Sequence, residues 1–235
     1  MLSSKNATGG TFGAGIGGGG GGNGDVTISG NAKIENAQGG YAGSGIGGGY
    51  GASGTVTIKD DSTVTATGGE AGAGIGGGVG GLADVTIEGN ATVNAIGGVG
   101  SAGIGGGYDA ENDEDDGNGN QISIKSNESG APTVNATGGE SSIDKKTGEK
   151  IPGGAGIGSG AGDAKANITL EGKVTIVAKA GEGNAAIGDM NGEQVFTGLD
   201  GSITRYDSEG NDTTFPPTRL PRPLADTVLF GRRLW

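Results

Sequence analysis

Apolar and polar residues alternate in short runs that recur along most of the chain. In DVTISGN at Asp25 and TVTIKDD at Thr55, valine and isoleucine lie two residues apart with a threonine between them. A period of two places successive side chains on opposite faces of a β-strand, and it forms no stripe on a helix. The run returns as DVTIEGN, QISIKSN and NITLEGK. The pattern therefore predicts many short strands and no helices.

Two further segments accompany each of these runs. A third apolar pulse follows the VTI run, and a glycine-rich segment such as GAGIGGG at Gly13 precedes it. The isoleucines at the centre of the glycine-rich segments are Ile16, Ile46, Ile75, Ile104, Ile157 and Ile187. Three strands in about 30 residues, separated by Gly, Asn and Asp turn residues, are typical of one solenoid coil. We therefore predict an all-β fold, a right-handed parallel β-helix of about six coils with three short strands in each.

The repeats cover most of the chain but not its last part. We predict repeats over residues 1–191, with insertions at 109–120, 126–130 and 140–152. Insertions in a solenoid project as loops from a rigid rod, and binding residues concentrate on such loops. Residues 192–235 contain all the arginines and no repeat. We expect them to form a tail or a cap over the open end of the solenoid.

The glycine-rich segment allows two interpretations. The positions on either side of its isoleucine, such as Gly45 and Gly47, are glycine in nearly every coil, and we place them on the outer face. Glycine weakens a strand, so a bare glycine column indicates that another sheet, a second solenoid or a flat ligand approaches closely. Sharp corners that only glycine can adopt explain the same column.

Composition and charge exclude several kinds of chemistry. The 235 residues include no cysteine and no histidine, so thiolate zinc sites, cysteine nucleophiles and serine–histidine pairs are excluded. A net charge of -12 disfavours binding to nucleic acid and to anionic membranes. No apolar run is long enough to span a bilayer. We therefore expect a non-enzymatic protein that binds no nucleic acid and inserts into no membrane.

The first insertion is a candidate calcium site. Calcium binds carboxylate and amide oxygens on loops that glycine allows to turn tightly. The candidate ligands are Asp109, Asp113, Asp115, Asp116 and Asn118. Their spacing departs from the EF-hand pattern, so a solvated charged loop explains the same run.

Tyrosines in the repeats are candidates for sugar binding, because aromatic rings give sugars an apolar platform. Tyr50 and Tyr108 both directly follow GIGGG, and Tyr41 lies in the repeats as well. A shared register two coils apart places Tyr50 and Tyr108 about 10 Å from each other, a spacing suited to an extended glycan. Placement at a corner without any ligand is the alternative.

The recurring GAGIGGG, VTIxGN and TVxATGG motifs resemble the glycine-rich parallel β-helix repeats of large bacterial surface proteins over residues 6–191. That group includes adhesin-like and carbohydrate-binding members. The resemblance implies an extracellular or cell-surface location, and it carries over no functional residue because the shared motif is structural. It favours a structural or adhesion module. The alternatives are a carbohydrate-binding module, with or without calcium, and a protein that self-associates laterally or into filaments. The expected partners are accordingly a polysaccharide, a host or cell-surface protein, or further copies of the chain.

Overall fold

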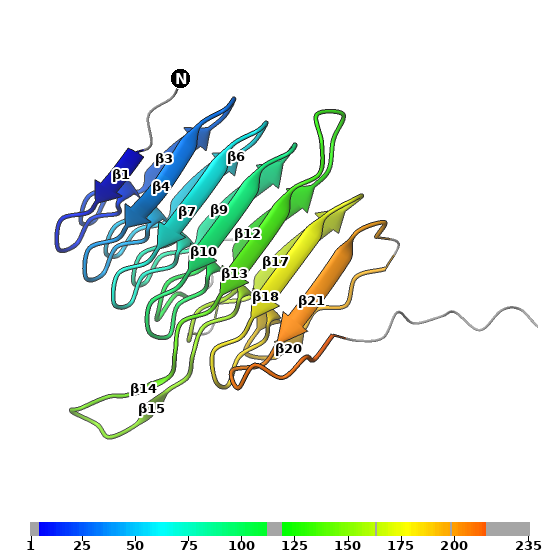
Figure 1. Ribbon diagram of the computed structural model, residues 1–235. Helices are drawn as coiled ribbons and strands as arrows, with labels where there is room; N and C mark the ends of the chain where they lie inside the picture. The colour runs from blue at the N-terminus through cyan, green and yellow to red at the C-terminus, as the bar shows by residue number, and fades with distance from the viewer. Residues whose placement is uncertain (1–4, 112–118, 163, 198, 215–235) are drawn as a thin grey trace, which may run out of the picture.

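The computed structural model describes residues 5–111, 119–162, 164–197 and 199–214. Every regular element among these residues is a strand, and the strands stack as successive coils of one solenoid (Figure 1). Each complete coil supplies one strand to each of three sheets, and the strands of neighbouring coils run parallel. The predicted right-handed parallel β-helix is confirmed.

We number the three sheets by the order of their strands within a coil. The first sheet contains β2 (Ile16–Gly17), β5 (Ile46–Gly47), β8 (Ile75–Gly76), β11 (Ile104–Gly105), β16 (Ile157–Gly158) and β19 (Ile187–Asp189). The second contains β3 (Gly24–Ile28), β6 (Gly54–Ile58), β9 (Ala83–Glu88), β12 (Asn120–Lys125) and β17 (Ala166–Glu171). The third contains β1 (Lys5–Thr8), β4 (Lys33–Gln38), β7 (Thr63–Thr67), β10 (Thr92–Ile96), β13 (Thr133–Thr137), β18 (Thr175–Lys179) and β21 (Ser202–Tyr206).

Equivalent residues of neighbouring coils pair directly, so the core is a set of side-chain ladders. Ile46 pairs with Ile75 in the first sheet, and Val56 pairs with Val85 in the second. All four side chains are at most 1% exposed. The second and third sheets face each other (Figure 1), and isoleucines of the first sheet join the same apolar cluster. Each coil thus buries its apolar face against the next coil, as stacking in a solenoid requires.

From the second coil on, the glycine column is buried and not bare, whereas Gly17 in the first coil is exposed. A Cβ on Gly45 would lie 2.6 Å from the carbonyl oxygen of Gly74 and 2.7 Å from that of Thr67 in the third sheet. Gly47 has a φ of 129°, which residues with a side chain rarely adopt. The backbone that approaches the glycines is therefore the chain's own, at a sharp corner. The expectation of a glycine face open to another sheet, a second solenoid or a flat ligand is wrong, and lateral association through such a face loses its basis.

The solenoid continues beyond residue 191. β21 pairs in parallel with β18, and β20 (Gly192–Glu193) folds back antiparallel onto β19. Phe196 and Leu199 pack against the end of the core. The predicted boundary between 191 and 192 therefore does not coincide with the end of the sheets. No repeat motif marks this strand, because it lacks the glycine-rich segment and ends in Arg205 and Tyr206.

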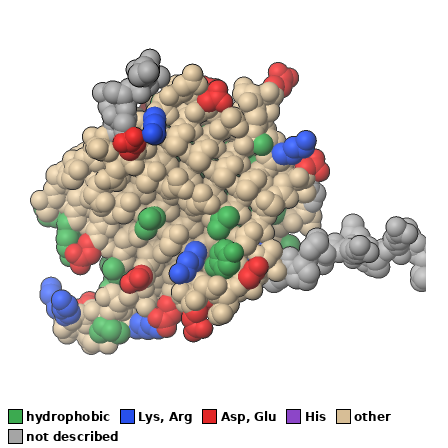
Figure 2. All heavy atoms as spheres, in the orientation of Figure 1, with side chains coloured by type: hydrophobic (Ala, Val, Ile, Leu, Met, Phe, Trp, Pro, Cys, Tyr) green, Lys and Arg blue, Asp and Glu red, His purple; other side chains and the backbone are tan. Residues whose placement is uncertain are grey.

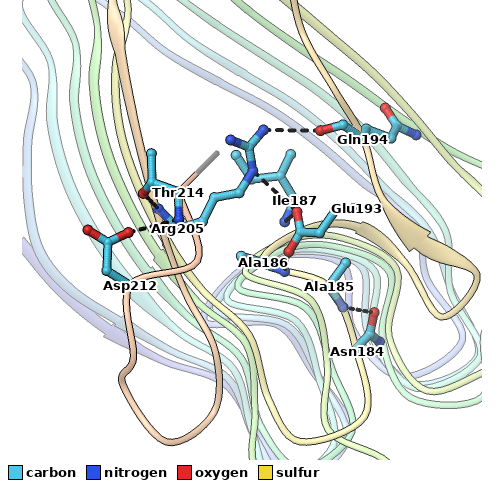
Figure 3. A network of polar contacts seen from close by, with 9 residues as sticks. All are labelled: Asn184, Ala185, Ala186, Ile187, Glu193, Gln194, Arg205, Asp212 and Thr214. Carbon is cyan, nitrogen blue, oxygen red and sulfur yellow. Dashed lines mark hydrogen bonds and ion pairs between the residues drawn. The ribbon is translucent and has the colours of Figure 1, made fainter. Parts of the chain in front are cut away.

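A buried arginine holds this last segment in place (Figure 3). Arg205 is 5% exposed, its Nε lies 3.2 Å from Glu193 Oε2, and its Nη2 donates to the carbonyl oxygen of Gln194. The carboxylate of Glu193 also accepts the N–H groups of Ala186 and Ile187 at β19. The Glu193 carboxylate thus satisfies backbone donors at the edge of the last coil. Because these N–H groups are already bonded, further strand pairing is limited there.

The insertions leave their coil at opposite ends. Residues 126–130 lengthen the turn between β12 and β13, and residues 140–152 form a hairpin of β14 (Ser142–Ile143) and β15 (Lys150–Ile151). Figure 1 shows the turn projecting at one end of the coil and the hairpin at the other. The first insertion is described only at residues 109–111 and 119–120. The hairpin and the 126–130 turn therefore cannot line one site.

Candidate functional site

Residues that follow GIGGG form one column along the corner of the solenoid. The N–H of Gly51 donates to the carbonyl oxygen of Val79 at 2.7 Å, and the N–H of Gly80 donates to that of Tyr108 at 2.7 Å. These bonds stack Tyr50, Val79 and Tyr108 on successive coils. Tyr50 and Tyr108 do share a register, but a valine separates them.

Among the residues that the structure describes, the exposed aromatic ones lie on the first coils. The rings of Phe12 and Tyr50 are 5.7 Å apart between centroids and tilted by 59°. The two residues are 53% and 51% exposed, and Tyr41 is 56% exposed. Tyr108 is only partly exposed and lies in a different environment, against the hairpin. The structure therefore does not bring the three predicted tyrosines into one site.

Ser101 fixes the backbone at Tyr108. This serine is fully buried, and it stands where the neighbouring coils have Gly72 and Gly154. Its Oγ accepts the N–H of Tyr108 at 2.9 Å. The serine hydroxyl therefore positions the turn at Tyr108. The glycine of the neighbouring coils has no hydroxyl and could not do so.

Asp109 has a strained backbone at a position that is glycine in other coils. Its φ is 59°, and the equivalent Gly51 and Gly80 have φ values of 68° and 73°. A residue with a side chain in this region costs on the order of 1–3 kcal/mol and occurs preferentially at functional sites. Asp60, the other such residue in the described part of the chain, has a φ of 61° and accepts the N–H of Gly30 at 2.8 Å, so it stabilises the turn of the neighbouring coil.

The hairpin and the corner column meet above Gly100. A Cβ built on Gly100 would lie 2.9 Å from Tyr108 Cδ2, 3.2 Å from Ile151 Cγ2 and 3.4 Å from the Cβ of Ala161. Gly100 also has a positive φ of 66°. The absence of a side chain here lets the tyrosine ring and the second strand of the hairpin pack over the backbone.

An open pocket of about 230 Å³ lies between the hairpin and the corner column. We call it the corner pocket. It is lined by Tyr108, Asp109, Asp144, Thr147, Glu149, Lys150, Ile151, Pro152, Ala161, Gly162 and Met190. In the space-filling view (Figure 2), charged side chains of both signs gather around the projecting hairpin. The pocket thus combines parts of three coils with the insertion that interrupts the repeat.

Negative charge dominates the ionisable groups around Tyr108. Burial is the main cause that raises the pKa of Tyr108, and the negative charges of Asp109 and Asp144 raise it further. The pKa of Asp144 is lowered because its carboxylate accepts the N–H groups of Lys146 and Thr147. Asp144 is therefore ionised at neutral pH.

One carboxylate from the next coil holds both sides of the hairpin. Glu182 accepts a hydrogen bond from Ser141 Oγ at 2.7 Å, next to β14, and forms an ion pair with Lys150 in β15. These contacts lower the pKa of Glu182, with the hydrogen bond from Lys150 as the largest cause. The carboxylate thereby positions the hairpin beside the corner pocket.

Comparison with known proteins identifies the repeat. Residues 26–50, 56–79 and 85–108 each match the family model of a beta helix repeat. Every match starts in a strand of the second sheet and ends at the corner column of Tyr50, Val79 and Tyr108. The chain is a parallel β-helix. No curated protein and no solved structure matches this β-helix significantly.

The β-helix places one of its predicted calcium ligands in the corner pocket. That residue is Asp109, whereas Asp113, Asp115, Asp116 and Asn118 lie outside the described residues. Among the residues that the structure describes, no group of three or more acidic side chains is arranged to hold a metal ion. Calcium binding stays a prediction. Over the same described ranges, no helix is long and apolar enough to cross a membrane.

Sequence reasoning missed part of the β-helix's corner pocket. Ser101, which fixes the turn of Tyr108 but does not line the pocket, carried a readable signal, because SAGIGGG has serine in place of the first glycine of GAGIGGG. Asp109 also replaces a glycine of the repeat, a signal separate from the acidic character that makes it a candidate calcium ligand. Asp144 and Glu149 carried no comparable signal, because the direction in which the hairpin leaves the coil decides where they lie.

Proposed function

We propose that the protein is a non-enzymatic adhesion module of a bacterial cell surface that contacts its target at the corner pocket. The observation that carries this proposal is that Asp109 and the hairpin, two departures from the repeat, line one pocket. A third departure, the buried Ser101, accepts the N–H of Tyr108 and so fixes the backbone of a residue in the same lining. Coils with the same sequence present the same surface, so a local binding site in a solenoid requires a break in the repeat.

Composition and motif support the other parts of the proposal. The chain has no histidine and no cysteine to act as a general base or nucleophile, which favours binding over catalysis. The GAGIGGG and VTIxGN motifs resemble repeats of bacterial surface proteins, which favours a cell-surface location. A rigid rod that carries one projecting hairpin suits a module that presents a contact to a partner.

The proposal is tested by removing the hairpin without altering the coil. Replacement of residues 141–153 by a single alanine converts the segment after Thr137 to TGGEAGAGIG, the sequence that Thr67–Gly76 already has. A matched control replaces residues 126–132 by Gly-Asn-Ala, the turn that joins β9 and β10 at residues 89–91. This control removes the insertion at the opposite end of the same coil.

The readout is retention on immobilised glycans, mucin and extracellular-matrix proteins, with circular dichroism as the check on folding. We expect at least one surface to retain the native protein, and the hairpin replacement to weaken retention about tenfold or more, a loss of about 1.4 kcal/mol. The control should bind like the native protein. Equal retention of both variants would rule out the corner pocket as the contact, and no retention on any surface would rule out the adhesive role.

A second candidate function is carbohydrate binding along the aromatic residues of the first coils. It is favoured by the exposed pair of Phe12 and Tyr50, because sugar rings stack on exposed aromatic faces. Tyr50→Ala and Tyr108→Ala distinguish the two sites. Loss of glycan retention in Tyr50→Ala alone would favour the aromatic pair over the corner pocket.

A further inference from the structure

Charge is unbalanced in the lining of the corner pocket. Asp109, Asp144 and Glu149 line it, and Lys150, which lines it as well, is ion-paired with Glu182 outside the lining. Lys146 lies close enough to Asp144 to contribute to its lowered pKa, but it is not part of the lining. The lining therefore attracts a cation and repels an anion.

The lining of the pocket also contains apolar side chains. The ring of Tyr108 lies with Ile151 and Ala161 above Gly100, and Pro152 and Met190 also line the pocket. A bare metal ion would gain nothing from these apolar side chains, because hard cations bind through oxygen ligands alone. The site instead suits a molecule with a flat apolar face and a cationic group at its edge.

We infer that the corner pocket binds an amino sugar with a free primary ammonium group, carried in a glycan chain. The C–H face of the sugar ring lies against the ring of Tyr108. The ammonium group donates charge-assisted hydrogen bonds to Asp109 and Asp144. This inference rests on the proposed binding role of the corner pocket and adds the class of ligand.

The test compares two glycans that differ only in N-acetylation, which removes the positive charge of each amine and adds an acetyl group. The probes are the tetramer of β-1,4-linked glucosamine and its fully N-acetylated form, titrated calorimetrically into the complete chain at mildly acidic pH and low salt. We expect the free amine to bind about tenfold or more tightly than the acetylated form. Added salt should weaken that binding, because screening reduces attraction between exposed charges.

Two asparagine variants assign the effect to the pocket. Asp109→Asn keeps a residue that tolerates a positive φ, and it should weaken binding of the amine tetramer about tenfold. Asp84→Asn removes the same charge from an exposed position on the outer face of β9, and it should leave the affinity unchanged. Equal losses in the two variants would indicate non-specific attraction to an acidic protein and would overturn the inference.

The remaining outcomes separate this inference from the proposed function. If both tetramers bind equally and the hairpin replacement abolishes the binding, recognition of the ammonium group is overturned. The corner pocket then remains the contact. Binding of a lysine-containing peptide but not of the amine tetramer would overturn the assignment of the ligand as a sugar. If neither tetramer binds, the inference fails, and retention of the hairpin variant on the surfaces above decides the proposed function independently.

Discussion

Replacing Asp109 with glycine should make the protein more stable while it weakens binding at the corner pocket. Asp109 has a φ of 59° where the equivalent residues of earlier coils are Gly51 and Gly80. Asp109→Gly therefore restores the residue that the repeat uses at this corner. It also removes a carboxylate that lines the pocket.

The size of the effect follows from two opposing terms. A residue with a side chain at positive φ costs about 1–3 kcal/mol, and aspartate lies at the low end because it tolerates this region. Glycine offsets about 0.4–1 kcal/mol of the gain, because it makes the unfolded chain more flexible. The net expectation is a gain of up to about 0.6 kcal/mol, which corresponds to roughly 1–2 °C in Tm for a chain of this size.

The assay is thermal unfolding followed by circular dichroism, with hydrogen exchange of the amides near Tyr108 because solenoid coils can open separately. Asp60→Gly is the matched control. It has nearly the same φ, 61°, but its carboxylate accepts the N–H of Gly30. Losing that bond costs about 0.5–1.5 kcal/mol and cancels the relief of strain. A lower Tm for Asp109→Gly, or an equal rise for Asp60→Gly, would refute the reasoning.

The core, the tyrosine and the hairpin each give a further prediction. Ile104→Ala should lower the free energy of unfolding by about 3–4 kcal/mol, because the side chain of Ile104 is fully buried. Chemical denaturation measures this loss. A loss below about 1 kcal/mol would mean that neighbouring coils close the cavity. Asp109→Asn should lower the pKa of Tyr108, because Asp109 is one of the charges that raise it; absorbance titration of tyrosine checks this against Asp84→Asn, and equal titration curves would contradict it. The pKa of Glu182 is below its ordinary value of 4.5, so its contribution to holding the hairpin is present above that value and lost as pH falls through the lowered pKa. The amide shifts of Ser141 and Lys150 in NMR spectra should change over that acidic range. The change should be smaller in Glu182→Gln, where carboxylates of the hairpin itself, such as that of Asp144, remain.

The coils were predictable because a solenoid is built from contacts between neighbours. Valine and isoleucine two residues apart define a strand and its buried face. The repeat distance along the chain, such as that from Ile46 to Ile75, predicts which residues pair. No long-range information is needed for this inference, since each coil repeats the environment of the previous one. The right order of sheets and the isoleucine ladders could therefore be read from periodicity alone.

The last coil was not predictable in this way. β21 belongs to the third sheet although it lacks the preceding glycine-rich segment. Arg205 is buried there because Glu193 supplies the opposite charge. Local sequence does not reveal such a pair, because burial of the Arg205 charge is tolerated only where the fold places Glu193 next to it.

The sequence by itself determined the parallel β-helix, the positions of the insertions and the absence of histidine and cysteine chemistry. Only the tertiary structure decided that the glycine column is buried at a corner and that the hairpin, unlike the 126–130 turn, lies beside Tyr108. The physical reason is that periodicity specifies contacts between equivalent residues. Contacts between an insertion and the rod depend on the direction in which the chain leaves the coil, and here Glu182 and Gly100 set that direction.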